Sequence, residues 1–145
     1  MAPRRGHRRI RHGSHRSRRG PGVRVEILAV GTELLLGQIV NSNAAEIGER
    51  LADAGLDHHH QSVVGDNLER IADAIRLATA RSDALIVTGG IGPTQDDLTR
   101  EALSAASGME MVFDEGYAAR LRAYWEARGR EMPESNLRQA QHPAG

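Results

Sequence analysis

The stretch 84–101, ALIVTGGIGPTQDDLTRE, constrains the fold of this chain more than any other. Its first five residues are apolar or β-branched without alternation, which is typical of a strand covered on both faces inside a parallel sheet. The run ends at Gly89, Gly90 and Gly92, where the backbone can turn sharply and no side chain blocks a ligand. Because open α/β sheets bind ligands beyond the carboxyl ends of their strands, this turn predicts a binding site.

The same stretch continues into a predicted helix that begins with two acids. Pro93 favours a turn into that helix, with Thr94 or Asp96 as its cap. Free N–H groups at a helix start attract phosphate. Asp96 and Asp97 would repel a phosphate unless a divalent cation lay between them, so the pattern predicts a metal-bridged phosphate. The alternative is an acidic pair that only stabilises the helix dipole and caps the first turn.

The composition of the 145 residues fits one domain with an aliphatic core. Aromatic residues make up only 3% of the chain, so Leu, Ile, Val and Ala must fill the core. The chain has no Cys, which excludes disulfides, thiolate catalysis and Cys-ligated zinc, and fits the reducing cytoplasm where we expect the protein. No apolar run approaches the roughly 20 residues that span a bilayer, so we expect no membrane contact.

Residues 1–22 are predicted to form a disordered, Arg-rich tail. Residues 1–20 contain eight of the 19 Arg and no acid, which leaves 11 Arg against 19 acids in the remainder. The tail could contact nucleic acid, carry a targeting signal or be dispensable. A secretory signal is excluded because no apolar segment follows the basic residues.

Alternation of strands and helices predicts a three-layer α/β/α sandwich with a mostly parallel sheet. Helix caps are ambiguous: Asn43 has capping-box spacing to Glu46 and is favoured over Asn41 or Ser42, and Asp66 has the same spacing to Glu69. The expected elements are a strand at 23–30, an apolar loop at 34–36, a helix face of Val40, Ala44, Ile47, Leu51 and Ala54, a strand at 56–64, a helix striped by Leu68, Ile71, Ile75 and Ala78, and the strand and helix of the central stretch.

Later segments are expected to be peripheral. Residues 109–113 are predicted as a short edge strand, and the helix at 115–128 is expected to pack its aromatic residues against the sheet. Residues 132–145 are polar and bounded by prolines, so they are not expected to complete a core. The consecutive residues His58, His59 and His60 alternate faces in a strand and are expected at the surface.

Two turns are predicted to line one cleft. Gly31 and Glu33 follow the first strand, as the glycine turn follows the central strand, and the carboxyl ends of parallel strands share one edge of a sheet. Asn41 and Asn43 are each ambiguous between a helix cap and a polar ligand contact.

Three motifs, VGTELLLGQIVNSNA, VGDN and VTGGIGPTQDDLTREAL, resemble the N-terminal domain of CinA-type competence/damage-inducible proteins, within the molybdopterin-binding (MogA/MoaB/MoeA-like) fold family. FDEGYAARL and NLRQAQHPAG match the later family pattern, so the resemblance covers 23–145. It implies a cleft for a phosphorylated pterin or nucleotide. It further implies metal-dependent hydrolysis of dinucleotide pyrophosphates such as ADP-ribose, giving AMP and ribose 5-phosphate.

The resemblance also implies roles for individual residues. Asp96, Asp97 and Glu33 would be catalytic, with Asp96 and Asp97 holding a divalent metal (Mg, Mn or Co), optionally with a monovalent cation. The residues implied in phosphate or nucleotide binding are Gly31, Thr32, Asn41, Asn43, Thr88, Gly89, Gly90, Gly92, Pro93 and Thr94.

Departures from the family pattern leave three hypotheses open. The family usually continues past the equivalent of Gly145 into a hairpin at the cleft, and many members add a nicotinamide-nucleotide amidase domain. We therefore expect an incomplete domain, an open site and an unpaired sheet edge that favours a homo-oligomer. The chain is then a metal-dependent pyrophosphatase, a pterin- or nucleotide-binding module without turnover, or an inactive fragment with a polyanion-binding tail. The adjacent acids favour turnover, since a pure phosphate binder would carry Lys or Arg there.

Overall fold

The computed structural model describes residues 22–145, so the predicted tail lies outside the described residues except for Gly22. The elements in chain order are β1 (Arg24–Val30), α1 (Thr32–Leu35), α2 (Ser42–Asp53), β2 (Asp57–Val64), α3 (Leu68–Arg81), β3 (Ala84–Thr88), α4 (Thr99–Ser107), β4 (Met111–Phe113), α5 (Glu115–Glu126), the 3-10 helix η1 (Glu134–Ala140) and β5 (Gln141–Pro143).

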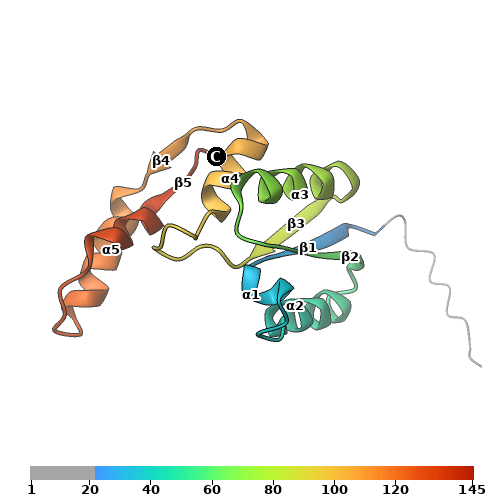
Figure 1. Cartoon of the computed structure of the whole chain (residues 1–145), viewed down its shortest axis with the longest axis horizontal. Helices are drawn as coiled ribbons and strands as arrows, with labels where there is room; N and C mark the ends of the chain where they lie inside the picture. Colours follow the sequence, from blue (N-terminus) through green and yellow to red (C-terminus); the bar gives the residue numbers. More distant parts are fainter. Residues whose placement is uncertain (1–21) are drawn as a thin grey trace, which may run out of the picture.

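The predicted three-layer sandwich with a parallel sheet is confirmed. Strand β1 lies between β2 and β3 and pairs in parallel with both. Its side chains alternate between two apolar clusters, because Leu28 and Val30 pack with α3 and α4 whereas Val25 and Ile27 pack with α2. Figure 1 shows α3 and α4 on one side of the sheet and α2 on the other.

Strand β3 is less covered than the sequence predicted. An unalternating apolar strand was expected to be buried on both faces, but β3 is an edge of the three-stranded sheet and its residues are partly exposed. The apolar pattern reflects contacts with the two helix layers, and it does not report whether a neighbouring strand lies on each side. Self-association through a sheet edge stays a prediction.

Two predicted helix caps are wrong. Asn41, not Asn43, caps α2 by accepting a hydrogen bond from the Ala44 N–H (3.2 Å), and Asn67, not Asp66, caps α3 by accepting from the Arg70 N–H (3.1 Å). Asn43 instead donates to Thr88 Oγ1, and Asp66 instead bonds to Thr32 in the turn after β1. Val40, expected on the core face of α2, precedes the helix and is 86% exposed.

The predicted apolar loop at 34–36 is partly helical. Leu34 and Leu35 belong to the single turn of α1, while Leu36 and Ile39 are exposed beyond it. The short helix follows β1 after a single residue, and the Leu36 N–H closes its turn by donating to the Thr32 carbonyl (3.1 Å).

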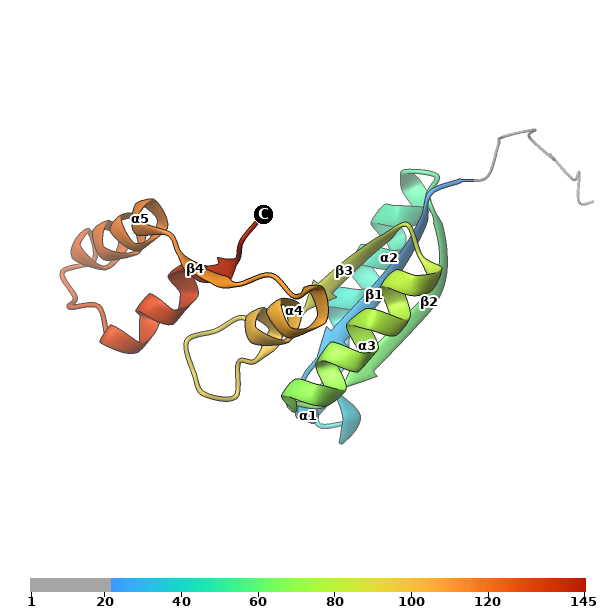
Figure 2. The ribbon, with the colours of Figure 1, turned by 90° about the horizontal axis from the view of Figure 1, so that it is seen from above.

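Helix α5 does not pack on the three-stranded sheet as predicted. Figure 2 shows it well away from β1, beyond β4, and its main contact is with η1. Ala118 is its one buried residue, and Tyr117 and Tyr124 are exposed. The chain segment 132–145 contributes more than its polar composition predicted, because β5 pairs antiparallel with β4 and Ala140 is buried.

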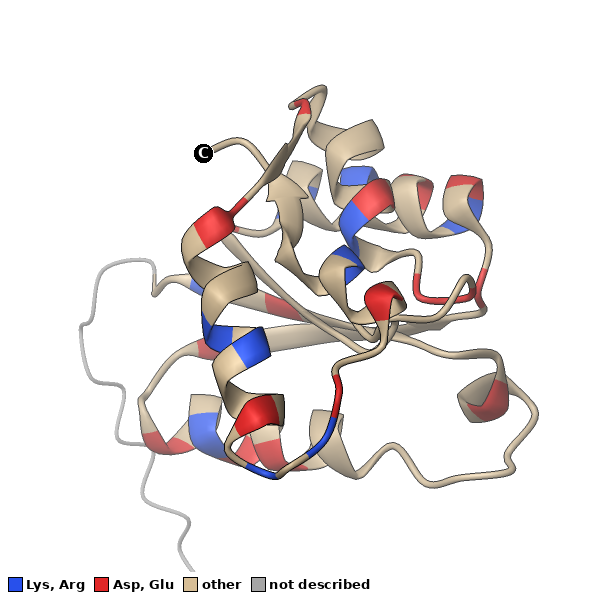
Figure 3. Cartoon of the chain, turned by 90° about the vertical axis from the view of Figure 1, so that its left-hand side faces the viewer, with Lys and Arg blue, Asp and Glu red and all other residues tan. Residues whose placement is uncertain are grey.

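Charged residues of both signs are interspersed along the helices, as Figure 3 shows, rather than gathered by sign. His59 and His60 are exposed, as predicted for the strand. Within residues 22–145, no helix has the length and apolar character needed to cross a membrane.

Candidate functional site

A cavity of about 250 Å³ lies at the carboxyl ends of β1 and β3, where the sequence predicted a cleft. Five of the predicted site residues line it, namely Glu33, Asn41, Asn43, Thr88 and Gly89, together with Val30, Leu34, Ile39, Val40 and Ser42. The turn after β1 and the turn after β3 therefore line the same cavity, and the start of α2 also lines it.

The polar groups of this cavity are only partly satisfied. The Asn43 side-chain amide donates to Thr88 Oγ1 (3.2 Å), which joins α2 to the end of β3. The Nδ2 of Asn41 is buried without a hydrogen-bond partner among the described residues. Glu33 is half-buried, and within residues 22–145 its carboxylate accepts no side-chain or backbone hydrogen bond. Two polar side chains thus keep donor or acceptor capacity for a ligand.

Thr32 is held by a residue that sequence analysis assigned to a helix cap. Asp66 Oδ2 accepts from the Thr32 N–H (2.8 Å), and Thr32 Oγ1 accepts from the Asp66 N–H (3.0 Å). This reciprocal pair fastens the turn after β1 to the turn after β2. The VGDN motif was the available signal, because it places an acid directly after a strand.

Close packing against β1 and the start of α4 explains the first two glycines. Gly89 and Gly90 have φ of 90° and 60°, and a Cβ on Gly89 would lie 2.0 Å from the Val30 carbonyl oxygen. On Gly90 it would lie 2.5 Å from Thr99 Oγ1, a buried hydroxyl that itself donates to the Gly89 carbonyl (2.8 Å). The turn brings β3, β1 and the start of α4 together at one point.

Asp97 binds the loop that follows the glycines. Its two carboxylate oxygens accept hydrogen bonds from the Gly92 N–H (2.8 Å), the Thr94 N–H (2.8 Å) and Thr94 Oγ1 (2.6 Å). Gly92 permits this approach, since a Cβ there would lie 2.6 Å from Asp97 Oδ2. Although burial acts in the opposite direction, these hydrogen bonds and the charge of Arg100 hold the pKa of Asp97 below its ordinary value.

The predicted caps of the following helix are also wrong. Helix α4 begins at Thr99, its N-cap is Leu98, and no side chain caps it. Thr94 and Asp96 lie too early in the chain, because the loop continues to Leu98 before the helix starts. The N–H groups predicted to cradle phosphate at Gly92 and Thr94 are those that Asp97 occupies.

The acidic pair and Glu33 do not converge. Neither Asp96 nor Asp97 lines the cavity that Glu33 lines. In residues 22–145 no group of three or more His, Cys, Asp or Glu side chains could hold a metal ion. Asp97 does not fit a metal ligand in this arrangement because three donors engage its carboxylate. Asp96 is exposed and accepts no hydrogen bond within the described residues, so it is free to meet a cation.

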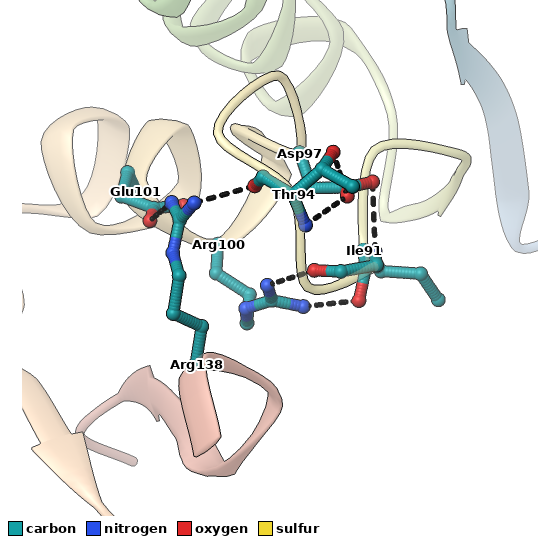
Figure 4. Close-up of polar contacts among 7 residues, drawn as sticks. Ile91, Thr94, Asp97, Arg100, Glu101 and Arg138 are labelled. Atoms are coloured by element: carbon teal, nitrogen blue, oxygen red, sulfur yellow. Dashed lines mark hydrogen bonds and ion pairs between the residues drawn. The ribbon is translucent and has the colours of Figure 1, made fainter. Parts of the chain in front are cut away.

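Arginines that sequence analysis passed over hold the outer side of the same loop (Figure 4). Arg100, which is buried, donates to the Ile91 carbonyl and to the Gly92 carbonyl (2.7 Å). Arg138 donates to the Thr94 carbonyl and to Glu101 Oε1 (2.8 Å). Both arginines belong to motifs that match the family, TRE at 99–101 and LRQA at 137–140, but their spacing in the sequence could not show that they contact the same loop.

The family model described as "Probable molybdopterin binding domain" matches residues 26–140. The chain belongs to this family. Two curated relatives, each named "Putative competence-damage inducible protein", are 52% identical over 123 residues (Moorella thermoacetica) and 49% identical over 118 residues (Bacillus cereus). These alignments cover 85% and 81% of this chain but only 30% and 29% of the relatives, so the chain spans less than a third of their length.

Solved structures place the chain in the CinA branch of the molybdopterin-binding domain family. CinA from Thermoplasma acidophilum, described as a protein of unknown function, has a TM-score of 0.76 at 33% identity, covering 84% of this chain and 71% of that one. The molybdopterin biosynthesis enzyme MoaB from Thermus thermophilus has a TM-score of 0.56 at 24% identity, covering 84% and 74% of the two chains, which supports the fold alone.

Proposed function

We propose that this molybdopterin-binding domain binds a phosphorylated pterin or nucleotide in the cavity at the ends of β1 and β3. One observation carries the proposal: the cavity contains an unpaired buried donor, Asn41 Nδ2, and an unbonded carboxylate, Glu33. A buried polar group without a partner is destabilising, so Asn41 Nδ2 favours a ligand that supplies an acceptor, and the accessible Glu33 carboxylate offers an acceptor to the same ligand.

The chemistry of the lining fits a ligand with both polar and flat apolar parts. Glu33 can accept from ribose hydroxyls or from a pterin amino group, and Asn41 can donate to a phosphate or carbonyl oxygen. A second cavity of about 300 Å³ adjoins at Asn43 and Thr88; Ile47, Leu51 and Ile86 form its apolar wall, and Glu46 and Arg50 lie at the same cavity. A cavity of that size with an apolar wall and a few polar groups suits a pterin ring or a nucleobase.

Binding is tested by isothermal titration calorimetry of the chain with ADP-ribose, ADP and inorganic phosphate. We expect the two nucleotides to bind more tightly than phosphate, and Glu33→Gln to weaken nucleotide binding roughly tenfold through the lost charge-assisted hydrogen bond. Glu49→Gln is the matched control, because Glu49 is exposed on α2 and does not line either cavity. Equal weakening by both variants, or no nucleotide binding, would reject the proposal.

A second candidate function is metal-dependent hydrolysis of ADP-ribose to AMP and ribose 5-phosphate. Its support is the Asp96 carboxylate, which is exposed and accepts no hydrogen bond within the described residues, because Mg²⁺ commonly binds through one or two carboxylates plus substrate phosphates. A bound divalent cation would neutralise the bridging phosphates. Because Glu33 lines the cavity and Asp96 does not, this function requires ADP-ribose to extend from the cavity to the Asp96 cation; Glu33 would then take a proton from water as general base, and Asp97 would keep the loop in position.

Hydrolysis is tested by following AMP release from ADP-ribose with Mg²⁺, Mn²⁺ or Co²⁺. We expect Asp96→Asn to lower turnover while ADP-ribose binding measured without metal stays unchanged. If the wild-type chain binds ADP-ribose but releases no AMP with any of the three metals, the domain is a binding module without turnover.

A further inference from the structure

Three charged side chains, those of Asp97, Arg100 and Arg138, form hydrogen bonds with the backbone of the loop between β3 and α4. Asp97 accepts from its N–H groups, whereas Arg100 donates to its carbonyl groups at Ile91 and Gly92. These two holders lie within or directly after the loop.

The third holder comes from a distant part of the chain. Arg138 lies in η1, 44 residues after Thr94, whose carbonyl it binds. Its guanidinium also forms an ion pair with Glu101 of α4 at 2.8 Å, with both side chains about 30% exposed or less. A planar guanidinium can donate to two acceptors at once, which makes Arg138 a bridge between the loop and α4 (Figure 4).

This bridge is a direct polar link between η1 and the loop, and it lies beside the packing of β5, which follows η1 in the chain, against α4. Segment η1 packs with α5 and β5, on the side of the molecule away from β1. The loop continues directly from Gly89, which lines the candidate cavity. A shift of η1 therefore reaches the cavity through Arg138 and the backbone of the loop.

We propose that Arg138 is a positioning residue that couples the docking of η1 to the conformation of the ligand-binding loop. The functional meaning of this coupling rests on the proposed ligand site, but the mechanical link does not. Because coupling between two sites is reciprocal, a ligand that orders the loop also protects η1 from exchange, and loss of Arg138 breaks both effects.

The test is amide hydrogen exchange of the whole chain with and without ADP-ribose. In the absence of ligand, Arg138→Ala should speed exchange of the amides in 91–97 about tenfold, as expected for the loss of a charge-assisted hydrogen bond. Arg138→Lys should give an intermediate value, because an ammonium cannot bridge both acceptors in the same way. Arg70→Ala is the control and should leave the loop unchanged, because Arg70 is exposed on α3 and its side chain makes no hydrogen bond within residues 22–145.

A second measurement separates coupling from simple stability. ADP-ribose should slow exchange in 134–140 of the wild-type chain, and this protection should disappear in Arg138→Ala and weaken in Glu101→Gln, while the Tm of the variants stays close to that of the control. Unchanged loop exchange in Arg138→Ala overturns the proposal. So does protection of 134–140 that persists in both variants.

If the wild-type chain binds no ADP-ribose, the proposed ligand fails, and the ligand-free exchange still decides whether Arg138 holds the loop. If Arg138→Ala does not fold by circular dichroism, Arg138→Lys and Glu101→Gln decide instead.

Discussion

At the scale of single residues, Asp97 was predicted from the sequence to bind a metal, but its carboxylate accepts hydrogen bonds from the protein's own backbone. The N–H groups of Gly92 and Thr94 would bind an anion, and the anion present is the Asp97 carboxylate. Asp96, its neighbour in sequence, is exposed. Adjacent identical residues therefore have different roles, because successive side chains of a turn point in different directions.

Asp97→Asn should lower the free energy of unfolding by about 1–3 kcal/mol, the range for losing hydrogen bonds to a charged group. An amide offers one oxygen where the carboxylate offers two, and its NH₂ would face an N–H donor. Urea unfolding at pH 7 measures the loss. Asp96→Asn is the control and should change stability by less than about 0.5 kcal/mol.

Acidification should reduce the difference in the free energy of unfolding between the wild type and Asp97→Asn. The folded-state pKa of Asp97 is lowered, so its stabilisation is present above the unfolded-state pKa, near 3.8, and is lost as the pH falls through the lower folded value. Repeating the urea series from pH 5 to pH 2 should bring the wild type and Asp97→Asn closer together. A difference that widens on acidification would contradict this account.

At the scale of elements, the turn after β3 depends on contact with β1. Gly89→Ala would place a methyl group 2.0 Å from the Val30 carbonyl oxygen at positive φ, so we expect a loss of at least about 3 kcal/mol from overpacking and backbone strain together. Gly37→Ala is the matched control, since φ is 67° but no atom lies within 4 Å of the added Cβ. Its loss should be about 1 kcal/mol. Equal losses in urea unfolding would show that strain alone matters.

An ion pair between the buried Glu26 and the partly exposed Arg81 fastens the start of β1 to the end of α3. Glu26 is 1% exposed and accepts from Arg81 Nε (2.9 Å) and Nη2 (2.6 Å) and from Ser82 Oγ (3.1 Å). The Arg81 hydrogen bonds lower the pKa of Glu26, against the effect of burial. The pair therefore stabilises the fold above the ordinary pKa of a glutamate, and this contribution is lost on acidification.

Removing one partner of this pair should be worse than removing both. Arg81→Met leaves the Glu26 carboxylate buried without its main partner, and we expect a loss of about 3–5 kcal/mol. The double variant Glu26→Leu with Arg81→Met should recover part of that loss, because no uncompensated buried charge remains. Urea unfolding of the two variants at pH 7 checks the order. A double variant less stable than the single one would contradict it.

At the scale of the whole molecule, stability should be unevenly distributed. Strand β1 is buried from Val25 to Val30, whereas α5 buries one residue of twelve and contacts mainly η1. Hydrogen exchange should therefore be fast in α5 and should reach the global limit in β1. Helix α3, with four buried residues, is the internal comparison, and its amide hydrogens should exchange as slowly as those of β1. Equal protection of α5 and α3 would show that the molecule opens as one unit.

The sequence by itself determined the layers of this protein and the place of its cleft. Hydrophobic periodicity reports which face of an element is apolar, and a strand followed by glycines reports a turn at the carboxyl edge of a parallel sheet. Both are local properties, so the elements and the shared position of Glu33 and Gly89 could be predicted from them.

Only the tertiary structure decided how polar groups are paired. The donors that Asp97 satisfies, the bond between Asp66 and Thr32, and the reach of Arg138 across 44 residues depend on the directions of side chains from different elements. Helix α5 was misplaced for the same reason, since an aromatic stripe shows that a helix has an apolar side but does not show which partner covers it. Spacing along a chain carries no information about such directions, because the packing of the elements sets them.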